Sequence, residues 1–454
     1  MASAAEQLAA NLNFSAFSKA DELKRRIWFT LGALVVYRLG TYIPLPGINP
    51  EALAQAFQQN QSGILGMFNM FAGGAVGRMA IFALGIMPYI SASIIMQLLT
   101  SVSKQLEQLK KEGESGRKKI NQYTRMGTVI LSALQAYGIA VGLEGGGSIV
   151  LDPGWFFRAT TVITLVGGTM FLMWLGEQIT ARGVGNGISL IIFAGIAAEL
   201  PAAFVGLLEL GRTGELSPFM IIGFGVLAVG VIAAIVFMER AQRRLLVQYP
   251  KRQVGSRMMQ GDTSHLPLKL NSAGVIPPIF ASSLLLLPAT FAAFQGTSGP
   301  DWLITVNALL GRGAILHIVL YVALIVFFCF FYTSIVINPT ETADNLKKYG
   351  GFIPGIRPGA KTAEYIDQVL TRITVLGAAY LAAVCVLPEI LISQMRFPFY
   401  FGGTSLLIAV SVTMDTVAQI QSHLLAHQYE GLIKRSKLRG ARAERSPAGG
   451  GRRR

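Results

Sequence analysis

The sequence predicts an all-α polytopic membrane protein whose ten transmembrane helices form two inverted five-helix halves. The first observation behind this prediction is composition: 52% of the 454 residues are apolar, 14% are charged, and the mean hydropathy is +0.50. Soluble domains carry about 25% charged residues, so this chain has too few polar groups to cover a surface in water. The second observation is a series of long apolar runs, and the third is a one-sided distribution of positive charge between them.

Ten apolar runs are each compatible with one membrane-spanning helix. A helix needs about 20 predominantly apolar residues to cross a hydrocarbon core of about 30 Å. The third and fourth runs are the weakest of the set on length. The ten predicted spans are 27–43, 79–102, 127–143, 160–175, 188–208, 219–238, 273–294, 314–337, 373–392 and 399–424.

Lysine and arginine residues are concentrated in alternate loops. Most of the 39 lie before the first span, in the loops at 103–125, 239–271 and 339–372, or after the last span. Those that fall in or beside the other loops are Arg38, Arg78, Arg158, Arg212, Arg312 and Arg396. Because Lys and Arg accumulate in cytosolic loops, the basic face is predicted to be cytosolic, with both termini inside. The net charge of +15 therefore indicates orientation in a membrane rather than binding to nucleic acid.

The number of spans in each half predicts how the halves are related. A cytosolic segment at 1–26 precedes the first half at 27–210, and the second half at 211–424 precedes a basic cytosolic tail at 425–454. Each half contains five spans, an odd number, so the two halves begin on opposite sides of the membrane. If they share a fold, they form an inverted repeat, an architecture that places the functional site between the halves.

One apolar segment breaks the pattern of spans. Residues 63–77, GILGMFNMFAGGAVG, are too short to cross a membrane and contain five glycines. Counting this segment as a span would also reverse every later loop and place the basic loops outside. A re-entrant or capping segment is therefore predicted, and an ordinary buried external loop is the alternative.

The sequence contains little catalytic machinery. It has no G-x-x-x-x-G-K-[ST] motif to bind nucleotide phosphates, and His423 and His427 have no clear third metal ligand. Cys329 and Cys385 each lie in an apolar run and are interpreted as packing residues. We therefore predict no enzyme activity, no cofactor and no metal. A small-solute transporter that uses Asp415, and an intramembrane hydrolase, are the alternatives from other functional classes.

The basic loops have more local order than simple connectors. The loop at 239–271 alternates basic and apolar residues, which is typical of a projecting β-hairpin. In the loop at 339–369, prolines and glycines on both sides of Arg357 stiffen the backbone. A cation on a pre-ordered turn loses little entropy on binding. Docking of a partner and contact with anionic lipid are both consistent with this composition.

Long stretches of the chain resemble the SecY/Sec61-alpha family, from about residue 15 to residue 435. They occur in family order and read FNMFAGGA, IFALGIMPYISASIIMQLL, KKEGESGRKKINQYTR, FLMWLGEQITARGVGNGIS, HLPLKLNSAGVIPPIFASS, NPTETADNLKKYGGFIPGIRPG and PFYFGGTSLLI. The resemblance implies two halves around an hourglass pore, closed by a re-entrant plug at 61–77. From periodicity alone the isoleucines of these stretches would be ordinary packing residues.

The resemblance also implies roles for individual residues. The pore-ring positions are Ile86, Ile90, Ile188, Ile192, Ile279 and Ile408. The plug positions are Met67, Phe68, Asn69, Met70, Phe71, Ala72, Gly73 and Gly74. Ser91, Gln135 and Leu287 match a lateral gate, and the docking surface for a motor or ribosome comprises Arg243, Arg244, Lys251, Arg252 and Arg357.

The function that the resemblance implies is a protein-conducting channel in a bacterial inner membrane. Such a channel passes unfolded preproteins across the membrane and releases apolar segments sideways into lipid through its lateral gate. The implied partners are the small membrane subunits SecE and SecG, the ATPase SecA, the ribosome, secretory preproteins with signal peptides, and anionic lipids.

Overall fold

The protein is almost entirely helical in the computed structural model. The structure describes residues 21–60, 69, 71–145, 149–214, 217–249, 252–254, 257–259, 263–294, 315–395 and 403–444. Each of the ten predicted spans overlaps one of its helices, which confirms the all-α prediction. Seven of the described helices are long and apolar enough to cross a membrane by length and composition.

The first five spans correspond to helices in the order predicted. They are α3 (Asp21–Gly40), α6 (Met87–Val102), α8 (Glu114–Gly145), α9 (Trp155–Arg182) and α10 (Gly187–Thr213). The second five are α11 (Pro218–Arg240), α12 (Ile276–Phe294), α14 (Ile315–Val336), α16 (Ala360–Met395) and α17 (Gly403–Glu444). Three shorter polar helices lie between them: α4 (Pro50–Asn60), α7 (Lys104–Lys111) and α15 (Pro339–Lys348).

The predicted start of the second span is wrong. The apolar run begins at Met79, but residues 79–86 form turns and helix α6 begins only at Met87. Two residues of these turns, Met79 and Gly85, have positive φ angles, and Pro88 occupies the first turn of the helix, where its missing N–H is harmless. Hydropathy cannot distinguish a turn buried inside a membrane protein from a helix, so the prediction merged the two.

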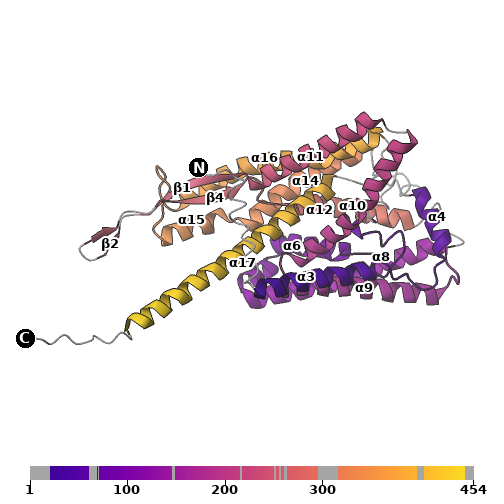
Figure 1. Ribbon diagram of the computed structural model, residues 1–454, viewed down its shortest axis with the longest axis horizontal. Coiled ribbons are helices and arrows are strands. Elements are labelled where there is room, and N and C mark those ends of the chain that lie inside the picture. Colours follow the sequence, from indigo (N-terminus) through magenta and orange to yellow (C-terminus); the bar gives the residue numbers. More distant parts are fainter. Residues whose placement is uncertain are drawn as a thin grey trace, which may run out of the picture.

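The helices pack as two groups that meet in two places. In the first group α8 packs against α6 and α9, and in the second α14 packs against α12 and α16. The groups meet where α12 packs against α6 and α8, and again where α10 packs against α11 and α17. In Figure 1, α3, α8 and α9 lie together on one side of the molecule and α11, α14 and α16 on the other.

A β-hairpin projects from one end of the molecule. Strand β1 (Gln242–Gln248) pairs antiparallel with β4 (Thr263–Lys269), and the short strands β2 (Arg252–Val254) and β3 (Arg257–Met259) form its tip. This confirms the predicted hairpin in the basic loop. Figure 1 shows the hairpin, α15 and the C-terminal end of α17 at the same end, with α4 at the opposite end.

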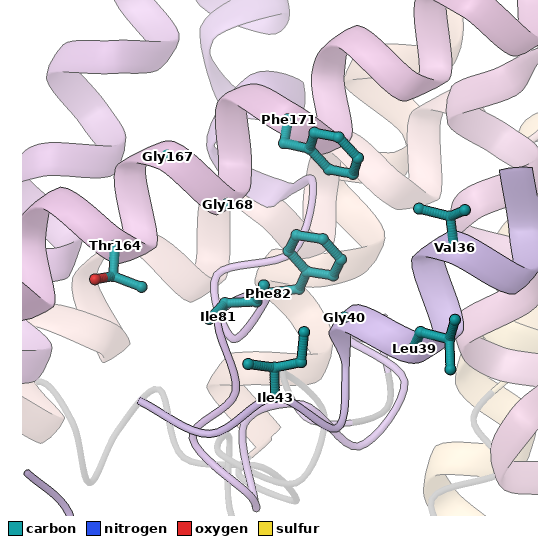
Figure 2. Close-up of a pocket in the computed structure, with 10 residues that line it drawn as sticks. All are labelled: Val36, Leu39, Gly40, Ile43, Ile81, Phe82, Thr164, Gly167, Gly168 and Phe171. Carbon is teal, nitrogen blue, oxygen red and sulfur yellow. The ribbon is translucent and has the colours of Figure 1, made fainter. Parts of the chain in front are cut away.

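Close backbone contacts hold the turns at 79–86 between α3 and α9. A side chain at Gly40 would overlap the ring of Phe82, and one at Gly168 would overlap the carbonyl oxygen of Ile81. Phe82 stacks on Phe171 of α9 with ring centroids 5.8 Å apart (Figure 2). An apolar cavity of about 390 Å³ opens beside these rings, and its lining comprises Val36, Leu39, Gly40, Ile43, Ile81, Phe82, Thr164, Gly167, Gly168 and Phe171. None of the six predicted pore residues lines it, so this cavity is separate from the predicted pore.

Candidate functional site

Five of the six predicted pore isoleucines belong to one large buried apolar cluster, and the sixth packs against it. Helix α10 contributes a pair of these isoleucines spaced four residues apart, which places both on one helix face. A second such pair lies at the N-terminus of α6, and α12 and α17 contribute one isoleucine each. Ile188 is partly buried and packs against the cluster, whereas the other five are at most 9% exposed. The set is Ile86, Ile90, Ile188, Ile192, Ile279 and Ile408.

This isoleucine cluster has the chemistry of a hydrophobic seal. A constriction of aliphatic side chains excludes water and ions by dewetting when it is empty. Aliphatic contacts are non-directional, so they accept side chains of any chemical type. The cluster is therefore suited to closing a conduit and unsuited to catalysis.

The described part of the predicted plug packs against the isoleucine cluster. We define the plug segment as residues 69 and 71–77; Met67, Phe68 and Met70 lie outside the described residues. Residues 71–76 are buried, and the apolar ones among them, Phe71 and Ala72 included, belong to the same cluster as the isoleucines. Asn69 closes the turn, because its side-chain oxygen accepts from the N–H of Gly77 at 2.7 Å and its carbonyl accepts from Gly74 at 2.8 Å.

Glycine is required where the plug segment touches the helices. Gly73 and Gly74 have φ angles of +65° and +80°, a region that other residues adopt only with strain. A Cβ atom at Gly73 would lie 2.9 Å from the Tyr37 hydroxyl of α3 and 3.1 Å from the Cα of Gly195 on α10. The two glycines therefore allow the segment to approach both helices directly.

Two arginines that sequence analysis did not assign to the site contact the plug segment. Arg38 donates a hydrogen bond to the carbonyl oxygen of Gly73, and Arg78 donates to the carbonyls of Gly73 and Gly74. Both guanidinium groups lie over the ring of Tyr42, at 4.9 Å and 4.1 Å from its centroid. The sequence did contain one signal that could have identified Arg38 and Arg78. Both belong to the small set of arginines that lie away from the predicted basic face.

Two of the predicted gate residues are buried on helices that α12 contacts. Ser91 on α6 and Gln135 on α8 are 5% and 6% exposed, and α12 packs against both helices. The side chain of Leu287 is outside the described part of the structure. Sequence analysis missed further buried polar residues on α8 and α12, namely Thr128, Ser132, Ser282 and Ser283. Within the described residues, the Gln135 Oε1 and Ser283 Oγ atoms have no hydrogen-bond partner, so the seam between α12 and α6/α8 is less well satisfied than an apolar one.

The predicted docking arginines lie on the projecting end of the molecule. Arg243 and Arg244 are exposed on β1, and Arg357 is exposed on a turn between Gly355 and Gly359, both of which have positive φ angles. The turn is tied to the hairpin, because Gln248 and Phe352 exchange two backbone hydrogen bonds of 2.9 Å. Lys251 lies outside the described residues, and only the backbone of Arg252 is described.

A small apolar core joins the two basic loops. Leu245 and Leu268 of the hairpin pack there with Ile353 of the second loop and Ile366 of α16. We call the hairpin and residues 339–359 the platform. The platform therefore has a fixed shape of its own rather than being two independent loops.

The acid of the transporter alternative is not enclosed in the bundle. Asp415 is exposed on α17. In the part of the chain that the structure describes, no three His, Cys, Asp or Glu side chains are grouped so that they could hold a metal ion.

Together, the helical groups, the isoleucine cluster and the buried plug segment define a channel-type membrane protein. The SecY family profile matches residues 80–417. The protein translocase subunit SecY of Pseudomonas aeruginosa is 58% identical over 92% of this chain and 95% of its own length. The protein translocase subunit SecY of Escherichia coli K12 is 55% identical over 94% of this chain and 97% of its own length. The chain belongs to the SecY family, as a channel subunit of a protein translocase.

Solved structures agree with the family in fold. One, described as the structure of a protein conducting channel, has a TM-score of 0.62 and 18% identity and covers 88% of this chain and 92% of its own. Sec61 in the canine ribosome–channel complex from the endoplasmic reticulum has a TM-score of 0.60 at 18% identity, with the same coverage. A third solved structure has a TM-score of 0.61 at 19% identity. It is described as showing that the plug domain of the SecY protein stabilises the closed state of the translocation channel.

Proposed function

We propose that this chain is the central channel through which unfolded preproteins cross a bacterial inner membrane, with both termini in the cytosol. The observation that carries the proposal is the convergence of six isoleucines from four helices of both groups into one buried cluster, with the plug segment packed against it. The five helices in each group support two inverted halves, 27–210 and 211–424, with the pore between them.

The proposed pore solves a solvation problem. A polypeptide that crosses lipid directly would leave backbone N–H and C=O groups without partners, at several kcal/mol each. Water-filled funnels on both sides of the isoleucine ring would supply those partners. The ring itself fits closely around any passing chain and closes when the chain has left.

Apolar segments of a preprotein leave through the seam between α12 and α6/α8. At the centre of a membrane helix, Leu or Ile favours lipid by about 0.3–0.6 kcal/mol per residue, while Lys or Asp opposes entry by about 2.5–3.5. An apolar segment of about 20 residues therefore partitions into lipid, and a polar one continues through the pore. The buried polar groups of the seam, Ser91 and Gln135 among them, support this role because they make the closed seam easier to separate.

The energy for movement comes from a partner that docks on the platform. The chain carries no G-x-x-x-x-G-K-[ST] motif, and the exposed Arg243, Arg244 and Arg357 lie on a rigid, projecting surface. We assign this surface, together with the predicted docking residues Lys251 and Arg252, to SecA or the ribosome. One ribosome-bound relative with the same fold supports the second partner. SecE, SecG and anionic lipids are proposed at the membrane-facing helices.

Site-specific crosslinking tests the proposed pore. A photoreactive residue is placed at position 86, 192 or 408 of the full chain, and a secretory preprotein is arrested halfway across. All three positions should crosslink to the arrested chain. Position 163, where Ile163 is 72% exposed on α9, is the matched control and should label lipid instead. Crosslinks confined to platform positions would show that the preprotein takes another path.

A further inference from the structure

Arg38 is the side chain that joins the plug segment to the helical frame. It lies in the last turn of α3, and its Nη1 donates to the Gly73 carbonyl oxygen at 2.6 Å. Because the guanidinium group is charged, this is a charge-assisted hydrogen bond, a class about twice as strong as neutral ones. The two residues are 35 positions apart in the sequence, so the bond connects separate parts of the fold.

The guanidinium group of Arg38 is held in position by a second contact. Its Nη2 donates to the Tyr42 hydroxyl at 2.9 Å, and the group lies 4.9 Å from the centroid of the Tyr42 ring. A planar guanidinium held by two directed hydrogen bonds loses less entropy per bond than a flexible ammonium group would. Arg38 is half-buried, so its bond to Gly73 is less screened by solvent than a surface contact.

Arg78 contacts the same carbonyls through longer bonds, and it also lies over the Tyr42 ring, 4.1 Å from its centroid. Its bonds to Gly74 and Gly73 are 3.2 Å and 3.3 Å long and span only four and five residues. Arg78 is exposed and belongs to the same loop as the plug segment. Its carbonyl bonds therefore act within the loop, whereas the bond from Arg38 connects the loop to α3.

We propose that Arg38 is a latch: a positioning residue whose bond to Gly73 keeps the plug segment against the isoleucine cluster while the channel is idle. This inference rests on the proposed channel function. A preprotein must displace the segment to pass, and displacement breaks the Arg38–Gly73 bond. Tyr42 keeps the guanidinium in place meanwhile, so that the returning carbonyl finds its donor already oriented. The strength of the latch thus sets the fraction of idle channels that are open.

The test measures ion conductance of proteoliposomes that contain the full chain with its partner subunits and no preprotein. Arg38→Gln should raise idle conductance about tenfold or more, because hydrogen bonds to charged groups are among the stronger ones in proteins. Arg38→Lys retains the charge but not the two-pronged geometry, and its conductance should fall between that of the parent and that of Arg38→Gln. The matched control is Arg212→Gln, which removes a positive charge from an exposed arginine beside another loop on the predicted outer side and should leave conductance unchanged.

The variants distinguish a latch from a simple effect of charge and from a loss of folding. Equal conductance for Arg38→Gln and Arg212→Gln would overturn the latch, and parental conductance for Arg38→Lys would show that charge alone matters. If Arg38→Gln fails to accumulate in the membrane, Tyr42→Phe decides, because it removes only the orienting hydroxyl; unchanged conductance would again overturn the latch.

Deletion of residues 67–74 tests the plug itself. If the deletion raises idle ion conductance but Arg38→Gln does not, the latch is refuted and the plug assignment stands. If neither variant raises the conductance, the plug assignment is refuted as well.

Discussion

Single residues of the plug segment show how closely backbone approach and sealing are linked. Gly73 faces Gly195 across the contact between the segment and α10, and a Cβ atom at Gly195 would lie 2.9 Å from the carbonyl oxygen of Phe71. Two glycines on opposite sides of one contact leave no space for a side chain. In the proposed channel, the seal would depend on the absence of side chains as much as on the isoleucines.

Replacing Gly73 with alanine should therefore loosen the plug segment. The left-handed backbone conformation costs a residue with a Cβ about 1–2 kcal/mol, and the new methyl group would also press against Tyr37 and Gly195. We expect Gly73→Ala to raise idle ion conductance severalfold and to lower the unfolding temperature in detergent. Gly230→Ala is the control, because Gly230 lies in α11 with open space around it. Parental conductance for Gly73→Ala would contradict the tight packing described here.

At the scale of elements, α12 is the helix that we propose controls opening towards lipid. It packs against α6 and α8, and these three helices carry buried hydroxyl and amide groups as well as buried apolar residues such as Leu285. An apolar seam of this size would be as well packed as a protein core and correspondingly hard to separate. In the proposed gate, the polar groups would weaken the closed seam, because Gln135 Oε1 and Ser283 Oγ have no partner among the described residues, and would gain water when the seam opens.

Gln135→Leu tests the polar seam. The substitution removes a buried, unpartnered amide oxygen and keeps a similar volume, so the closed seam should become more stable by about 1 kcal/mol. Transfer of an apolar segment of about 20 residues into lipid should slow about fivefold, while transport of soluble preproteins changes less. The readout is time-resolved crosslinking of the segment to lipid. Gln122→Leu, at an exposed glutamine of the same helix, is the control, and equal rates for both variants would remove the role of Gln135.

At the scale of the whole molecule, the platform and the membrane bundle are separate in composition and in packing. The platform has its own small core around Leu245, Leu268 and Ile353, while the isoleucine cluster lies among the helices. The two parts are continuous through α11 and α16. A force applied by a partner at the platform can therefore reach the second half of the bundle through rigid helices.

Arg357→Glu should block motor-driven export without unfolding the bundle. Arg357 is exposed on its turn, and surface substitutions usually change the free energy of unfolding by less than about 0.5 kcal/mol. We expect export driven by SecA in membrane vesicles to fall at least tenfold, with an unchanged unfolding temperature. Arg117→Glu makes the same charge change at an exposed arginine near the N-terminus of α8 and should retain most export. Normal export by the Arg357 variant would remove the docking role.

Helix positions were predictable from the sequence because partition into lipid is nearly additive along a local stretch of chain. In a membrane, the backbone of a spanning segment must satisfy its own hydrogen bonds, so an apolar run of sufficient length has one common solution. The prediction was wrong at 79–86, where the chain forms turns that are buried by other parts of the protein. An apolar turn of this kind has the same hydropathy as an apolar helix in lipid. The β-hairpin was predictable from the loop at 239–271 for the same reason, because alternation of basic and apolar residues is a local property of the sequence.

The site was predictable only through resemblance to a family. Periodicity alone made Ile192 and Ile408 ordinary packing residues, and nothing local marked Arg38 as the partner of Gly73. The tertiary structure decided that isoleucines from four helices belong to or pack against one apolar cluster, that residues 71–76 are buried beside them, and that Arg38 of α3 bonds to Gly73. These are contacts between segments distant in sequence, and their formation depends on how whole helices pack. The sequence by itself determined ten helices with one basic face, because hydropathy and charge act locally on each segment.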